Sequence, residues 1–164
     1  MATLEFFINT AIWELMNVEQ RTGACVTAQI MSIQPRLDAP ISLVTLNGGK
    51  QSLIDDLNKF AAKAGSLARQ RNRIVHDPWF VQGTTMEPYQ FVSTAYKKLD
   101  FGFKHTPTDG LLALQKKIHT LYHDFEKLHS KILSELPSFD RTRFLQSEGF
   151  KAYTTEGVAF LKRT

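Results

Sequence analysis

The residues with the clearest chemical potential form one short run, Arg71-Asn72-Arg73-Ile74-Val75-His76. A histidine gains and loses a proton near neutral pH, because the unperturbed pKa of its imidazole is about 6.5. An arginine keeps its positive charge at any ordinary pH, so its guanidinium needs an acidic partner or an opening to solvent. Together, these residue types suit proton transfer at an anionic group.

This run falls at the end of the longest central helix that the sequence predicts, from Lys50 or Gln51 to about His76. Apolar residues recur every three or four positions along it, which is the period of a helix with one buried face. Pro78 disfavours helical geometry at Asp77, so we expect the helix to end there.

The helical period also places the side chains of the run around the helix axis. Arg71 lies within the apolar arc, whereas Asn72 and His76 are four residues apart and share the edge of that arc. A guanidinium that points toward a core is unusual. We therefore expect Arg71 to reach a cleft at the end of the helix, or to pair with Glu14 or Glu19.

A simpler interpretation of the same residues stays open. Positive side chains are common in the last turn of a helix, because they stabilise the negative end of the helix dipole. Arg71, Arg73 and His76 can serve that role without any further function.

The rest of the chain predicts a mainly helical domain over residues 1–137 and a C-terminal extension, 138–164, with no clear periodicity. The further predicted elements, in chain order, are a helix over 3–31 with a bend at Gly23, a short helix over 36–46 with Pro40 in its first turn and Asn47-Gly48-Gly49 as its stop signal, a β-hairpin or small meander over 79–105 with a turn near 85–88, and a long helix from Thr108 or Asp109 to before Pro137.

The run 71–76 resembles the signature of the HEPN superfamily, which is an arginine, a polar residue that is often asparagine, a few variable residues and a histidine. Family members carry it near the end of a long helix in an up-and-down helical bundle. The following Asp77-Pro78-Trp79, the aromatic hairpin and the last helix resemble a bacterial subgroup in which a small sheet follows the signature. The resemblance covers about residues 3–136 and implies a four-helix bundle with the hairpin inserted before the last long helix.

Many HEPN proteins are metal-independent endoribonucleases, and the resemblance implies this activity, in a toxin or an antiviral defence effector. The RNA 2′-hydroxyl attacks the adjacent phosphate in such a reaction, and DNA lacks that hydroxyl. The resemblance assigns Arg71, Asn72 and His76 as catalytic residues. His76 would transfer protons, Arg71 would offset the charge that builds on the phosphate, and Asn72 would orient the imidazole or hold a phosphate oxygen. No cofactor or metal is expected.

The reaction needs both a base and an acid, and each chain supplies one His76. HEPN ribonucleases place a shared cleft at a dimer interface, and a two-fold dimer would bring together two copies of Arg71 and His76. We therefore expect RNA as the substrate and a homodimer built partly on this helix. Two alternatives stay open: a non-catalytic module that binds RNA or a protein, and an accessory subunit neutralised by a partner, such as an antitoxin or a minimal nucleotidyltransferase.

A second group of candidates lies in residues 79–105, where aromatic side chains alternate with basic ones. Such a pattern can stack bases and hold phosphates. The alternative is a sheet that packs its aromatic face on the helices and turns its lysines to solvent. The expected RNA-binding residues are Arg69, Arg73, Lys97, Lys98 and Lys104.

His119, His123 and Glu126 lie on the last predicted helix, and the two histidines have a spacing that permits metal binding. No third strong ligand lies near them in sequence, so we expect histidines that face solvent. Cys25 is the single cysteine, which excludes an intrachain disulfide, and its helical, partly apolar surroundings predict a buried thiol.

The composition sets outer bounds on these hypotheses. A net charge of +4 and a pI near 9.2 permit a nucleic-acid partner without requiring one. We expect a cytoplasmic protein without a membrane partner, because no signal-peptide pattern and no apolar run of roughly 18 residues occur in the sequence.

Overall fold

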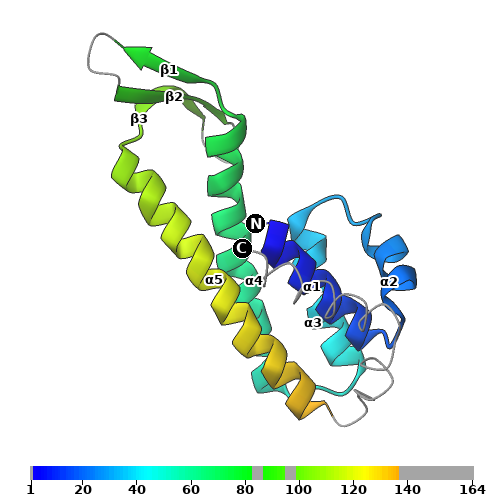
Figure 1. The fold of residues 1–164 in the computed structure, drawn as a ribbon. Helices are drawn as coiled ribbons and strands as arrows, with labels where there is room; N and C mark the ends of the chain where they lie inside the picture. The colour runs from blue at the N-terminus through cyan, green and yellow to red at the C-terminus, as the bar shows by residue number, and fades with distance from the viewer. Residues whose placement is uncertain (1, 83–86, 95–98, 137–164) are drawn as a thin grey trace, which may run out of the picture. The chain divides into compact units, whose positions relative to one another are not determined.

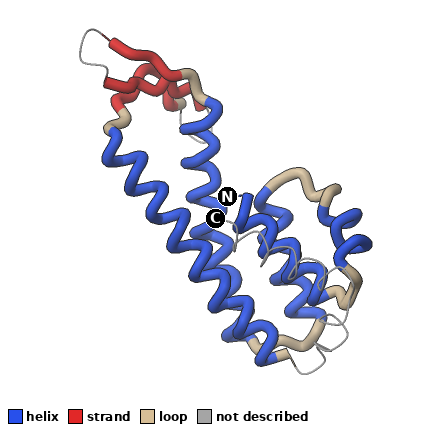
Figure 2. Tube along the Cα trace, in the orientation of Figure 1, coloured by secondary structure: helices blue, strands red, loops and turns tan. Residues whose placement is uncertain are grey.

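The computed structural model describes residues 2–82, 87–94 and 99–136, and these residues are mainly helical (Figure 1). Three antiparallel strands in the order β1-β2-β3 form one small sheet within the predicted range 79–105 (Figure 2). A mainly helical fold with a small sheet before the last long helix is thus confirmed. Over the described residues, the elements are α1 (Ala2–Leu15), α2 (Gln20–Thr27), α3 (Ile33–Leu46), α4 (Gln51–His76), β1 (Trp79–Gln82), β2 (Glu87–Thr94), β3 (Asp100–His105) and α5 (Thr108–Glu135).

Some predicted features lie wholly or partly outside the described residues. The C-terminal extension 138–164, Lys97 and Lys98 lie wholly outside them. The turn predicted near 85–88 lies outside them at 85 and 86, and Glu87 and Pro88 already belong to β2, where Glu87 pairs with Gln82.

The single helix predicted over 3–31 is wrong, because α1 and α2 are separate helices. Asn17 has a φ of 53°, the left-handed conformation that ends many helices. The amide of Val18 donates to the carbonyl of Trp13 at 3.1 Å, and that of Asn17 donates to the carbonyl of Glu14 at 2.9 Å. These two bonds form a Schellman cap, and an asparagine in that position was the signal for it in the sequence.

Gly23 allows close approach of α2 to α1 and does not bend a helix. A Cβ atom added at Gly23 would lie 2.3 Å from the ring of Trp13, which is too close for any side chain. The indole of Trp13 also donates to the hydroxyl of Thr27 at 3.1 Å. Since Gly23 and Thr27 form the buried face of α2, Cys25 lies on the opposite face. The predicted burial of Cys25 is therefore wrong: its side chain is exposed.

The helix α3 begins earlier than the predicted range 36–46. Pro35 lies in its first turn, where a missing amide N–H costs nothing. Pro40, expected in the first turn, lies inside the helix and is buried, so the carbonyl of Arg36 loses its helical donor. The stop signal is confirmed, since Gly48 has a φ of 74° directly after the helix.

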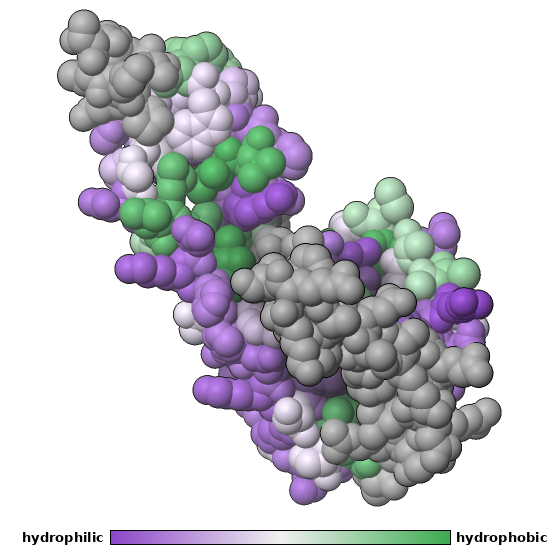
Figure 3. All heavy atoms as spheres, in the orientation of Figure 1, coloured by the Kyte–Doolittle hydropathy of each residue, from purple (hydrophilic) through white to green (hydrophobic). Residues whose placement is uncertain are grey.

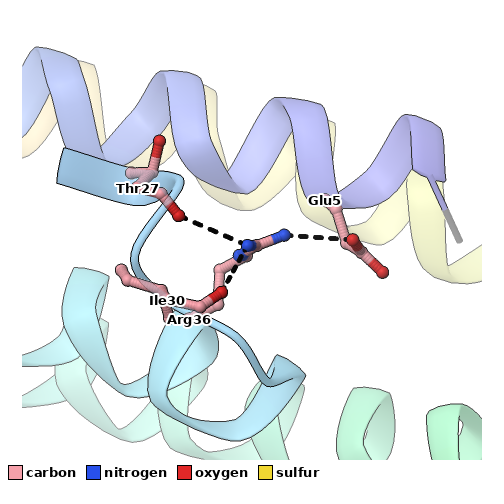
Figure 4. Close-up of polar contacts among 4 residues, drawn as sticks. All are labelled: Glu5, Thr27, Ile30 and Arg36. Carbon is pink, nitrogen blue, oxygen red and sulfur yellow. Dashed lines mark hydrogen bonds and ion pairs between the residues drawn. The ribbon is translucent and has the colours of Figure 1, made fainter. Parts of the chain in front are cut away.

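Arg36 connects three segments (Figure 4). One of its guanidinium nitrogens contacts the carboxylate of Glu5 in α1 at 3.0 Å. Another donates to the carbonyls of Thr27 and Ile30, at 3.4 and 2.6 Å. These carbonyls close α2 and the turn after it, so the charge of Arg36 lies where cations stabilise a helix end.

The described residues form two compact units, and both long helices contribute to each. Unit 1 comprises the described parts of 1–63 and 122–164. Glu14 is its one buried acid among the described residues, and its carboxylate contacts the imidazole of His129. The apolar core of unit 1 contains Leu4, Ile8, Ile12, Trp13, Leu37, Val44, Leu53, Leu57, Phe60, Phe125, Leu128 and Ile132.

Two ion pairs join α4 to α5 within unit 1. Lys131 contacts Asp56 at 2.6 Å, and Lys63 contacts Asp124 at 2.6 Å. The hydrogen bond from Lys131 lowers the pKa of the Asp56 carboxyl below its usual value, and the same bond raises the pKa of Lys131.

Unit 2 comprises residues 64–121: the last part of α4, the sheet and the first part of α5. Figure 3 shows hydrophilic side chains along the outer face of α5 and hydrophobic side chains gathered beneath the sheet, between α4 and α5. The buried apolar residues of this unit are Ala64, Leu67, Ala68, Val92, Leu114 and Leu121.

Candidate functional site

The helix α4 ends at His76, as predicted, and the next three residues attach the sheet to it. Pro78 has no amide N–H and cannot donate to the carbonyl of Ile74, four residues before it. The indole of Trp79 donates to that carbonyl instead, at 2.7 Å. The amide of Phe91 in β2 donates to the carbonyl of Pro78 at 2.9 Å. Both β1 and β2 are therefore bonded to the chain next to His76.

Four of the predicted site residues form a polar stripe on α4, which we call the α4 stripe: Arg69, Asn72, Arg73 and His76. Their spacing of three, four and seven residues puts them on one side of the helix. Arg69, Asn72 and His76 are exposed, and Arg73 is half-buried. Any ligand that contacts this face meets two guanidinium groups and an imidazole.

Arg71 projects from a different side of α4 and is half-buried, but its side chain turns toward the stripe. Its guanidinium donates to the amide oxygen of Asn72 at 3.2 Å. The structure thus gives Arg71 a bond to Asn72 and not to Glu14 or Glu19, the pairing expected as the alternative to a cleft. This bond brings Arg71 and Asn72 together.

His76 is exposed in the last turn of α4. Within the described part of the chain, no hydrogen bond or ion pair engages its imidazole. Both ring nitrogens can therefore contact a ligand. An exposed imidazole without a committed partner is the chemical requirement for a proton-transfer group.

Asp77 links the sheet to the end of α4, a contact that the sequence analysis did not predict. Its carboxylate accepts a hydrogen bond from the side-chain amide of Gln90 at 2.9 Å, and it lies 3.6 Å from the guanidinium of Arg73. Gln90 is 6% exposed, so the bond ties the buried face of the sheet to the end of α4. The sequence offered one hint of this contact, an acidic residue directly before Pro78.

A cavity of about 270 Å³ lies beside the α4 stripe, within unit 2. Arg73 lines it from α4, Lys104 and His105 line it from β3, and Leu111 lines it from α5. The structure therefore brings together Arg73 and Lys104, two of the five predicted RNA-binding residues. Arg73 and Lys104 place cationic groups on two sides of this cavity, which suits an anion.

The sheet exposes its aromatic face, contrary to the alternative in which that face packs on the helices. Val92 and Gln90, at 1% and 6% exposure, point to the buried side. Lys104 is paired with Gln90 and therefore shares this side of the sheet. On the opposite side, together with Ser93, the pairing places six ring-bearing residues, which we call the aromatic face: Phe80, Tyr89, Phe91, Phe101, Phe103 and His105.

The histidines of α5 face solvent, as predicted. His119 and His123 are exposed, and the imidazole of His123 contacts the carboxylate of Glu126 at 2.9 Å. A hydrogen bond from the Tyr122 hydroxyl lowers the pKa of Glu126. Over the described residues, no group of three metal-ligating side chains occurs.

Comparison with known proteins adds no assignment to this geometry. No protein family, curated protein or solved structure matches the chain. Among the helices of the described residues, none has the length and apolar character needed to cross a membrane.

Proposed function

We propose that the end of α4 is the active site of a metal-independent endoribonuclease of the HEPN type. The observation that carries the proposal is the exposed, uncommitted imidazole of His76, one turn from Asn72 and its bonded partner Arg71. An up-and-down four-helix bundle as the complete fold is part of the same proposal.

The proposed reaction transfers a phosphoryl group within the RNA strand. A base removes the proton of a 2′-hydroxyl, whose oxygen bonds to the adjacent phosphorus while the bond to the 5′-oxygen of the next nucleotide breaks. An acid returns a proton to that leaving oxygen, which yields a 2′,3′-cyclic phosphate and a 5′-hydroxyl. His76 serves as a proton-transfer group, and Arg71 stabilises the negative charge on the phosphorane.

A homodimer supplies the second proton-transfer group in this proposal. Two copies of His76 in one cleft can act as base and acid, because a neutral imidazole can accept a proton and a protonated one can donate it. An antitoxin or a nucleotidyltransferase partner would then act by covering the end of α4.

The experiment is cleavage of a labelled RNA strand by the purified protein in EDTA. We expect fragments with cyclic phosphate ends, and no cleavage of the DNA strand of the same sequence. His76→Ala should lower the rate by about 10²- to 10⁴-fold, and Arg71→Ala by at least about 10²-fold. His119→Ala and Arg21→Ala, at exposed positions elsewhere, are the matched controls. Equal cleavage by His76→Ala and by the wild type would refute the proposal.

A second candidate function is binding without cleavage, and the exposed aromatic face favours it. The cationic cavity would then hold the phosphates of a bound strand. RNA binding that survives His76→Ala, with no cleavage by the wild type, would support this function. In either case Arg73→Gln should weaken binding at all sequences alike and reduce the slope of log affinity against log salt by about 1.

A further inference from the structure

The aromatic face is unusually exposed for a surface that consists of large rings. Phe101, Phe103 and Phe80 are 68%, 65% and 48% exposed. A small sheet that has a single helical layer on one side normally turns polar residues to the other side. Here the buried side carries Val92 and Gln90, and the solvent side carries the phenylalanines, so the outer side departs from that pattern.

Contacts among the rings hold this face in a defined arrangement. Phe91 lies between Phe101 and Phe103, at centroid distances of 5.2 and 5.3 Å. Phe80 of β1 contacts Phe103 at 5.3 Å. These pairs meet edge to face, so the outer rings are supported from the side. The flat π-surfaces of supported rings can receive further planar groups, and nucleobases are such groups.

The charge of unit 2 points to a polyanion as the carrier of those planar groups. Residues 64–121 contain eight Lys and Arg residues and four Asp and Glu residues, so this unit has the full formal charge of +4 of the chain. Lys104 lies between Phe103 and His105 in β3 and reaches the cationic cavity. Since β3 is an edge strand and Lys104 points to the side opposite the aromatic face, a strand whose bases lie on that face would bring its phosphates to Lys104 and Arg73 by passing over this edge.

The face also begins close to the proposed active site. Phe80 lies four positions after His76, so their Cα atoms are at most about 14 Å apart. Stacked nucleotides rise by about 3.4 Å each, so about four of them cover this distance. Moreover, β1 is bonded to α4 through Trp79, which fixes the start of the face relative to His76.

We propose that the aromatic face binds unpaired nucleotides by base stacking, and that the substrate of the site is therefore single-stranded RNA. The inference rests on the proposed function for its cleavage step, because it names the strand that the end of α4 would cut. Paired bases cannot reach the face, since a duplex keeps its own bases stacked inside. A second copy of the chain fits the face less well, because it would bring another positively charged unit to this one.

The experiment measures the binding of a labelled DNA strand of about 12 nucleotides, which cannot be cut, by fluorescence anisotropy. Phe101→Ala and Phe103→Ala should each weaken binding by at least about 5-fold, the factor that corresponds to about 1 kcal/mol per stacked base. Phe103→Trp should retain binding, and Phe103→Leu, which keeps apolar surface but not the ring, should not. Leu112→Ala is the matched control, because Leu112 is an exposed apolar residue of unit 2 outside the sheet.

Each outcome distinguishes this inference from the proposed function. Unchanged strand binding by Phe101→Ala and Phe103→Ala overturns the stacking inference, even where His76→Ala abolishes cleavage. Weaker strand binding by the two variants, with no RNA cleavage by the wild type, supports the stacking inference and refutes the proposed ribonuclease function. Equal affinity for the strand and for its duplex overturns the inference. Sedimentation that shows the two variants losing self-association, with strand binding intact, makes the face a protein interface and overturns it as well.

Discussion

Replacement of Trp79 by phenylalanine removes the donor that replaces the missing amide of Pro78. The carbonyl of Ile74 has no helical donor four residues later, and the indole of Trp79 bonds to it at 2.7 Å. Phenylalanine keeps an aromatic ring at this position but cannot donate. The variant Trp79→Phe therefore tests whether this single bond holds β1 against the end of α4.

The magnitude follows from the partial burial of the two residues. A protein hydrogen bond contributes about 0.5–1.5 kcal/mol net, and a fully buried carbonyl without a donor costs up to about 3 kcal/mol. Trp79 and Ile74 are both half-buried, so water can reach the carbonyl in part. We expect a loss of about 1 kcal/mol, which lowers the melting temperature of a chain of 164 residues by about 2–4 °C.

Amide hydrogen exchange locates the effect. The amide of Asp77, bonded to the carbonyl of Arg73, and that of Phe91, bonded to the carbonyl of Pro78, lie on either side of the lost bond. Both should exchange about 5-fold faster in the variant, the factor that corresponds to about 1 kcal/mol of easier local opening. The indole of Trp13, which lies in unit 1, is an internal control. Unchanged exchange at Asp77 and Phe91, together with an unchanged melting temperature, would refute the reasoning.

Two further substitutions test the packing and the ion pairs. Gly23→Ala should destabilise the protein by about 1–3 kcal/mol in urea unfolding, because the new Cβ would lie 2.3 Å from Trp13. The control Gly110→Ala, whose new Cβ would have its nearest neighbour at 3.9 Å, should be neutral or stabilising by up to about 1 kcal/mol, and equal effects of the two substitutions would contradict this reasoning. Asp56→Asn should be less stable than the wild type at neutral pH, because it loses the ion pair with Lys131. This difference in stability should vanish as the pH falls below about 3.8 and through the lowered pKa of Asp56, since the protonated carboxyl no longer pairs with Lys131, and a difference that persists at pH 2 would exclude the ion pair as its cause.

The end of α4 could be predicted because its signals are local. The apolar period, Pro78 and the spacing of Asn72 and His76 act within a few residues of each other, and the structure places the helix end at His76. The break between α1 and α2 was local too, but the apolar stripe continues across it. The continuous stripe led to the prediction of one helix, whereas the left-handed conformation of Asn17 ends α1 in the structure.

The arrangement around the site could not be predicted, because it depends on long-range pairing. Which face of the sheet is buried follows from the register of β2 and β3 and from what packs beneath them, and alternation alone does not choose the side. The bond between Asp77 and Gln90 and the meeting of Arg73 with Lys104 likewise join residues from different elements. The residue types of these side chains did not indicate which of them meet in the fold.

The charge of unit 2 links the two proposals that concern partners. A homodimer that joins two α4 ends brings together two units that each carry a formal charge of +4, and their repulsion opposes assembly. This charge already includes Asp77, the acid beside the α4 stripe that contacts Gln90 and Arg73. The phosphates of a bound strand can supply the missing negative charge for both copies. Because such coupling is reciprocal, a strand that promotes the dimer must bind the dimer more tightly than the monomer.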